Sequence, residues 1–101
     1  MIKLSEFGSI VCSRKNGEIV REKILEEIKN GNIVEINFEG VEMINHSFAD
    51  EAFGKLLYDL PVDVFKNRIK FIKANDDVKG IIKMAIAERY RLIEEEKKIA
   101  V

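Results

Sequence analysis

The segment "NIVEINFEG", residues 32–40, alternates apolar and polar side chains over its whole length. Val34, Ile36 and Phe38 fall on one face of an extended strand, whereas the residues between them are acidic or amide side chains. Such alternation is typical of a strand whose one face packs on a core while the other stays in contact with water. The segment therefore predicts a sheet that carries its helices mainly on one face.

Extended and helical patterns alternate along the rest of the chain. Residues 1–12 read as strand material broken at Gly8, and residues 69–73 as a further strand. Apolar side chains recur at helical spacing in three other segments. The resulting order, strand and helix in turn with short connections, predicts an α/β fold with a mixed or parallel sheet joined by right-handed crossovers. The three helices are expected at 13–31, at 48–60, where Pro61 stops the second helix, and at 77–97.

The first of these helices has a strong cap signal at each end. Ser13 is a suitable N-cap, and Gly31 is a suitable terminator. The pair Asn16-Gly17 also reads as a turn, which leaves a start at Glu18 open. We favour the longer helix, because Gly17 would fall on the apolar stripe, where a missing side chain permits close packing.

Length and composition set the class of protein. The 101 residues are enough for one small domain, 1–101, and 47% hydrophobic with 35% charged residues is typical of a globular chain. The 17 basic and 18 acidic side chains are interleaved, without the basic patch of a nucleic-acid binder. Neither a membrane-spanning run nor a secretory signal is present, which predicts a cytoplasmic protein. The single cysteine, Cys12, agrees with a reducing compartment and is read as a buried, inert thiol in preference to a reactive one.

The segment "INHSFADEAFGKLL", residues 44–57, places three polar residues at the start of the second helix. Ser47 with Asp50 three residues later forms a capping-box pattern, which predicts that both cap the helix. Catalysis is not favoured, because the adjacent side chains of His46 and Ser47 point apart and Asp50 and Glu51 lie about 100° apart around the helix axis. No metal site is expected, because Cys12, Asp50 or Glu51 would have to converge on a lone histidine without a recognised spacing. No cofactor motif is present, and the sequence predicts a protein that is not an enzyme.

Helical geometry divides the second helix into a core stripe and an outward face. An exposed glycine in mid-helix costs on the order of 1 kcal/mol relative to alanine, and aromatic side chains near water need an explanation. Close approach by a partner would explain these residues, and ordinary tolerance at a solvated surface is the alternative. The face expected to point outward holds Phe48, Glu51, Gly54, Lys55 and Tyr58.

These motifs resemble a known family. A strand ending in "NFEGVEMI" and a helix beginning "SFADEAFG" resemble the STAS domain of anti-anti-sigma factors and sulfate-transporter tails. The likeness is closer to the STAS-like family of unknown function, whose members carry a similar turn and helix start and a Ser-Arg pair such as Ser13-Arg14. The resemblance implies a regulatory module with a protein partner, either a histidine-kinase-like ATPase or an anti-sigma-type protein.

The loop of classical STAS members reads Asp-Ser-Ser-Gly, and a partner kinase phosphorylates one serine. The matching residues here are Asn45, His46, Ser47 and Phe48, so Ser47 is the hydroxyl that remains. A phosphate there would meet the negative charges of Asp50 and Glu51, and we therefore favour docking over a phosphoswitch at Ser47.

The leading hypothesis is a regulatory module that docks a protein partner. A small-ligand sensor for a nucleotide or anion, and a self-association module using the tail "IAV" at 99–101, are the alternatives. The residues expected to bind the partner are Asn45, His46, Phe48, Glu51, Gly54 and Tyr58.

Overall fold

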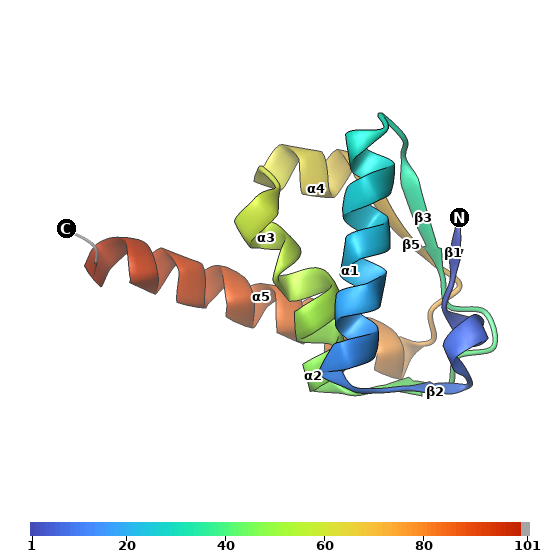
Figure 1. Ribbon diagram of the computed structural model, residues 1–101. Helices are drawn as coiled ribbons and strands as arrows, with labels where there is room; N and C mark the ends of the chain where they lie inside the picture. Colours follow the sequence, from blue (N-terminus) through green and yellow to red (C-terminus); the bar gives the residue numbers. More distant parts are fainter. Residues whose placement is uncertain (100–101) are drawn as a thin grey trace.

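The core of the computed structural model, which describes residues 1–99, is a three-stranded parallel sheet. The strand β3, Val34–Asn37, lies in the centre, between β1, Ile2–Lys3, and β5, Ile69–Ile72. Figure 1 shows these strands together at one side of the molecule, with the helices on the other. The expected α/β class, with a parallel sheet and helices mainly on one face, is confirmed.

Side-chain alternation in β3 orients the sheet as expected. Val34, Ile36 and the following Phe38 are buried at 0–1% exposure, whereas Glu35 is exposed. Asn37 departs from the pattern, because its amide is covered by the side chain of Met1, whose sulfur lies 3.5 Å from Nδ2. The open face of the sheet is otherwise polar along β3.

Two extended segments of the chain, residues 2–11 and 34–44, are each interrupted once and continue as a second short strand. The turn of 3₁₀ helix η1, Leu4–Phe7, separates β1 from β2, Ile10–Val11, and a turn at Gly40 separates β3 from β4, Met43–Ile44. Beyond the interruption, β2 and β4 pair in parallel as a second, two-stranded sheet. Gly8 and Gly40 both have positive φ, of 116° and 82°, so the predicted break at Gly8 is confirmed.

The first helix, α1, spans Arg14–Lys29 and follows the longer prediction. The Ser13 hydroxyl accepts a hydrogen bond from the backbone N–H of Asn16, so Ser13 is the N-cap. Gly31, at φ 85°, ends the helix in a Schellman motif, in which Gly31 N–H bonds to the Ile28 carbonyl and Asn32 N–H to that of Glu27.

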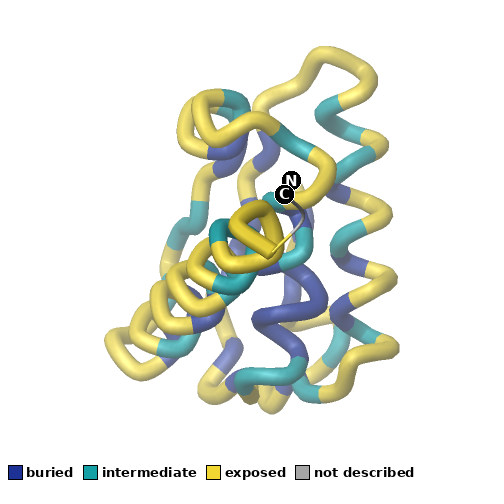
Figure 2. The backbone as a smooth tube through the Cα atoms, turned by 90° about the vertical axis from the view of Figure 1, so that its left-hand side faces the viewer, coloured by how far each residue is buried: buried dark blue, intermediate teal, exposed yellow. Residues whose placement is uncertain are grey.

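The segment after the turn 45–47 consists of three helical pieces in place of one regular helix. They are α2, His46–Ala49, the π-helical turn η2, Asp50–Gly54, and α3, Leu56–Asp59. Figure 2 shows a continuous buried stretch through this part of the chain, and residues 48–54 are all buried. The three pieces lie between α1 and the last helix, α5, Asp76–Ile99, and form the centre of the helical layer.

One helix was not expected from the sequence. Pro61 ends the preceding segment, as predicted, and then serves as the N-cap position of α4, Val62–Arg68. The guanidinium of Arg68 donates hydrogen bonds to the carbonyl oxygens of Ile28 and Asn32, which ties the end of α4 to the end of α1. Asp63 in the first turn and Arg68 in the last were the sequence signals that could have revealed this helix.

Candidate functional site

The turn 45–47 lies at one end of the molecule, where α2 begins. Asn45 is the N-cap, because it is extended, at φ −102° and ψ 168°, and its Oδ1 accepts a hydrogen bond of 2.9 Å from the Phe48 N–H. The expectation that Ser47 and Asp50 cap this helix is therefore wrong. An asparagine caps as well as a serine, and here it lies two residues earlier in the chain.

The predicted outward face is largely wrong as well. Phe48, Glu51 and Gly54 are buried, with Phe48 at 0% exposure and packed edge to face against Phe53, at 5.9 Å between ring centroids. A helix enclosed by other helices is buried all round, so the face opposite its most apolar stripe is not a solvent face. Of the six residues expected to bind a partner, Asn45 and Tyr58 are exposed and His46 is half-buried.

The π turn is a further reason for this error. Lys55 N–H bonds to the Asp50 carbonyl at 2.9 Å, five residues back, which inserts one residue relative to an α-helix. Residues on either side of this turn therefore do not share the faces that a period of 3.6 residues assigns to them.

Two glycines allow the neighbouring helices to approach this central segment. A Cβ on Gly17 of α1 would lie 2.8 Å from the Phe48 carbonyl oxygen and 2.7 Å from the Glu51 Cβ. A Cβ on Gly54 would lie 2.7 Å from Asp50 Oδ1 and 3.2 Å from the Cβ of Arg89 on α5. The close packing expected at Gly17 is confirmed. At Gly54, the close approach is made by the chain's own α5.

Asp50 lies at the centre of an ion-pair cluster. Arg89 donates from Nε to Oδ1 at 2.9 Å and from Nη2 to Oδ2 at 2.5 Å, and Arg14 donates from Nη1 to Oδ2 at 3.0 Å. Burial by itself would raise the pKa of Asp50, but these hydrogen bonds outweigh it and lower the pKa below its usual value. The same contacts raise the pKa of Arg89.

Glu51 is held in the same way by different partners. Arg21 donates to its Oε2 at 2.6 Å and also bonds to the Glu51 backbone carbonyl, whereas Lys55 and Arg14 each lie 3.1 Å from Oε1. Burial would raise the pKa of Glu51, but these cations lower it to about 2. Arg14, which is 50% exposed, touches both carboxylates through the same Nη1 atom.

The chemistry of this cluster is therefore that of fixed charges. Carboxylates with lowered pKa values stay ionised near neutral pH and cannot act as general acids there. Within residues 1–99, no three His, Cys, Asp or Glu side chains lie together as a metal site. His46 lies beside Glu88 of α5, with 3.3 Å between Nε2 and Oε2.

Three exposed apolar side chains lie on elements that adjoin the turn 45–47, namely β2, β4 and α5, and the sequence reasoning missed them. Ile10 and Met43, which are 55% and 53% exposed, are register partners in the β2–β4 pair. Met84, which is 59% exposed, lies on α5 one helical turn before Glu88, the residue that pairs with His46. We call Ile10, Met43, Met84 and the turn 45–47 the end surface.

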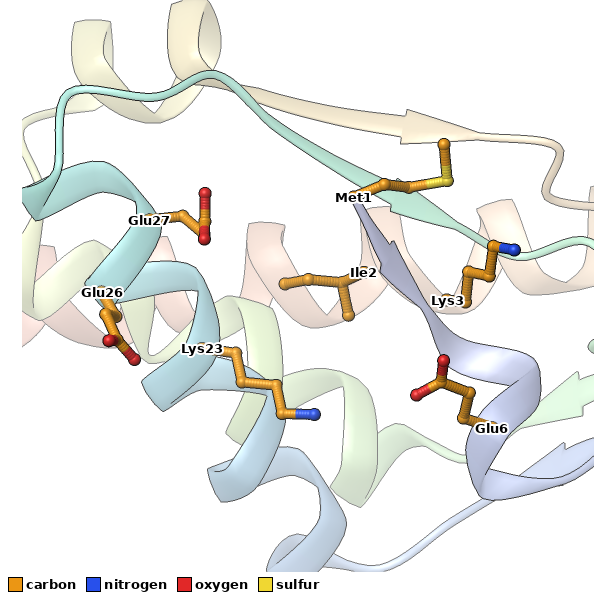
Figure 3. Close-up of a pocket in the computed structure, with 7 residues that line it drawn as sticks. All are labelled: Met1, Ile2, Lys3, Glu6, Lys23, Glu26 and Glu27. Carbon is orange, nitrogen blue, oxygen red and sulfur yellow. The ribbon is translucent and has the colours of Figure 1, made fainter.

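The hollows of the molecule have different linings. Beside the end surface, a hollow of about 350 Å³ is lined by Met43, Ile44, Asp77, Val78 and Ile81, so its one charged side chain is a carboxylate and it does not suit an anion. A second hollow of about 200 Å³ lies between β1 and α1, where Glu6 and Lys23 extend toward one another (Figure 3). A third, of about 480 Å³, is an apolar groove between α3, α4 and α5.

The comparisons with known proteins point to one family. A family model described as a STAS-like domain of unknown function matches residues 16–79, which is more than half of the chain. No curated protein and no solved structure matches the chain. Among residues 1–99, no helix has the length and apolar character needed to cross a membrane.

Proposed function

Because the chain belongs to the family of STAS-like domains of unknown function, we propose that it is a regulatory module that docks a protein partner and carries out no chemistry of its own. The observation that carries this proposal is the end surface. Ile10, Met43 and Met84 are each more than half exposed, and they lie on β2, β4 and α5, the elements that adjoin the turn 45–47. Large apolar side chains exposed on neighbouring elements are typical of protein–protein contact.

The surroundings of the end surface support docking over ligand binding. The hollow beside it is lined mainly by apolar side chains, and the Asp77 carboxylate is its one charged group. A nucleotide or anion site would need hydrogen-bond donors or cations at this place. The resemblance to anti-anti-sigma factors suggests a histidine-kinase-like ATPase or an anti-sigma-type protein as the partner.

The proposed surface differs from the one that the sequence suggested. Phe48, Glu51 and Gly54 leave it because they are buried, and Tyr58 leaves it because its hydroxyl lies on the side of α5 that carries Glu96, 3.1 Å from Oε1. Asn45 and His46 remain in it. The exposed methionines and Ile10 replace the buried residues as the apolar part.

Capture of the partner by the full-length protein tests this proposal. The variant Met43→Asp with Met84→Asp places two charges on the end surface without touching the core. The control is Ile33→Asp, at a side chain that is 61% exposed and follows the far end of α1. We expect the wild type and the control to retain the same protein from extracts of the native cells, and the double variant to lose it. Equal retention by all three would overturn the proposal.

A phosphoswitch at Ser47 is a second candidate, favoured by two observations. Asn45 provides the cap, so Ser47 is not needed for it, and Ser47 is only half-buried. The negative charges of Asp50 and Glu51, which would repel a phosphate, face four cations. Incubation with ATP and the partner kinase should add the mass of one phosphate to the wild type and none to Ser47→Ala. The absence of this mass gain with the partner kinase would remove the switch.

A further inference from the structure

An open apolar groove lies along the side of α5 that faces α3 and α4 (Figure 1). Its volume is about 480 Å³, and a smaller hollow of about 160 Å³ extends it toward Phe71 of β5. The two hollows share Lys83 and Ile86 in their linings, so they form one continuous surface, which we call the α5 groove. The apolar side chains that line its larger part are Leu57, Val62, Phe65, Ile86, Ala87 and Tyr90.

The α5 groove has the length and openness to hold one helix. Along α5 it extends from Lys79 to Tyr90, which are eleven residues apart, or about 16 Å. This length equals about three turns of an α-helix. Tyr90 and Val62 are 50% and 44% exposed, and Leu57 is only partly buried, so the apolar lining is open to solvent. The described chain therefore leaves uncovered a length of apolar surface that one further helix would fill.

The charged side chains that line the α5 groove are all lysines. Lys66 projects from α4, and Lys79 and Lys83 project from α5. The whole chain has 17 basic and 18 acidic side chains, so a lining with three lysines and no carboxylate differs from the average surface of this protein. Each of the three is exposed, and none is a partner in any ion pair between described residues. The groove thus carries unpaired positive charge along both of its sides.

The carboxylates that flank this lining along α4 and α5 do not neutralise it. Asp63 and Asp76 each lie three residues before one of the lysines, a spacing that permits pairing on a helix, but neither pair forms. Beyond the other end of the groove, Glu94 pairs with Lys97 at 3.4 Å, so these two residues add no net charge there. The unpaired lysines therefore set the charge of the groove.

We propose that the α5 groove docks an amphipathic helix of a partner protein, and that carboxylates border the apolar face of this helix. The apolar face fills the groove between α4 and α5. Carboxylates on one side of the docked helix lie against Lys66, and those on the other side lie against Lys79 and Lys83. A helix satisfies its own backbone hydrogen bonds, so it suits a groove that offers apolar side chains and few polar groups, whereas an extended segment would need an open sheet edge.

The charge of the occupant follows from the repulsion within the groove. Lys79 and Lys83 are four residues apart on one helix, where like charges destabilise each other. An acidic helix relieves this repulsion, whereas a basic helix adds to it and a neutral helix partly covers three ammonium groups without pairing them. At 100° per residue, Met84 and Glu88 lie on another side of α5, so this docking site does not depend on the end surface.

Binding of designed peptides to the full chain tests the proposal. The probe is a labelled peptide of about 18 residues, stapled on its outer side to keep it helical, with leucines along one face and glutamates on both sides of that face. One matched peptide has lysine at each glutamate, and another has serine at each leucine. By fluorescence anisotropy, we expect a dissociation constant of about 100 μM or lower for the probe, and values at least about tenfold higher for both matched peptides.

Charge reversal on the protein locates the site. Lys79→Glu with Lys83→Glu should raise the dissociation constant of the probe by about tenfold or more. The control, Lys15→Glu with Lys70→Glu, changes the net charge equally at exposed lysines of α1 and β5 and should bind the probe as the wild type does. Circular dichroism and thermal unfolding of each variant show that the fold is retained.

A substitution at Tyr90 separates docking in the groove from simple attraction of charge. Tyr90→Lys removes an exposed apolar wall and adds a positive charge. Docking in the groove predicts weaker binding of the acidic probe, whereas attraction by net charge predicts tighter binding. Tighter binding by this variant, or equal weakening by the two pairs of lysine reversals, overturns the proposal. So does a wild type that leaves the probe unbound at about 1 mM protein, and binding to phosphatidylserine vesicles in that case would assign the groove to a membrane surface.

Discussion

Arg89 and Asp50 form a bidentate ion pair between α5 and the central helical segment, with Nε–Oδ1 at 2.9 Å and Nη2–Oδ2 at 2.5 Å. The two residues are 39 positions apart, and both side chains are largely buried, at 17% and 7% exposure. The pair closes over Gly54, whose missing side chain lets α5 approach. Charge and close packing thus fix α5 at the same point.

Removal of Arg89 should destabilise the protein strongly. Arg89→Ala leaves Asp50 buried with Arg14 as its remaining cation, and breaking a buried pair in this way costs about 3–5 kcal/mol in the free energy of unfolding. Arg14 should hold the loss at the lower end of that range. Urea unfolding measures it, with Arg91→Ala as the control, because the ion pair between Arg91 and Glu95 is exposed and worth less than about 1 kcal/mol. Equal losses for the two variants would contradict the assignment.

Stability should fall in acid because of Glu51. Its pKa is lowered to about 2 in the folded protein, from 4.5, so the stabilisation is present above the higher value and is lost as pH falls toward the lower one. The full contribution is on the order of 3 kcal/mol. Glu51→Gln should therefore show a smaller difference in the free energy of unfolding between about pH 7 and about pH 3 than the wild type. The exposed Glu22→Gln should retain the wild-type difference.

Alanine in place of glycine should lower the stability of the protein at two helical positions and raise it at a third. Gly17→Ala and Gly54→Ala force the new Cβ against atoms 2.7–2.8 Å away, so each should cost about 1–3 kcal/mol despite the better helix propensity of alanine. Gly80 of α5 has no atom within 4 Å of the added Cβ, and Gly80→Ala should stabilise by about 0.5–1 kcal/mol. Thermal and urea unfolding measure all three. Stabilisation by Gly17→Ala would mean that α1 lies farther from the central segment.

The cap of α2 can be assigned by two substitutions. Asn45→Ala removes the acceptor of the Phe48 N–H and should cost about 1 kcal/mol, whereas Ser47→Ala should change stability by less than about 0.5 kcal/mol. The capping box read from the sequence predicts the reverse order. Urea unfolding of the two single variants distinguishes the two assignments, and Asn45→Ser, which preserves an acceptor, should recover most of the loss.

The tail suggested for self-association, residues 99–101, starts at the last residue of α5. Ile99 is 83% exposed at the end of α5, and Ala100 and Val101 lie outside the described residues.

The sequence was sufficient wherever structure depends on neighbours along the chain. The alternation of Val34, Ile36 and Phe38 predicted the central strand, and Ser13 and Gly31 predicted both ends of α1. Local backbone and side-chain hydrogen bonds decide these features, so a short window contains the needed information. The helix start at "SFADEAFG" likewise indicated the family.

Tertiary structure alone decided what the central helical segment does with its polar residues. Asp50 and Glu51 could be read as first-turn acids, but their partners Arg14, Arg21 and Arg89 lie 30–39 positions away. The π turn shifts the helical faces, and α1 and α5 cover both sides of the segment, so Phe48 and Gly54 are enclosed. Periodicity reports which side of a helix is most apolar, but only the packing of neighbouring helices determines which side meets water.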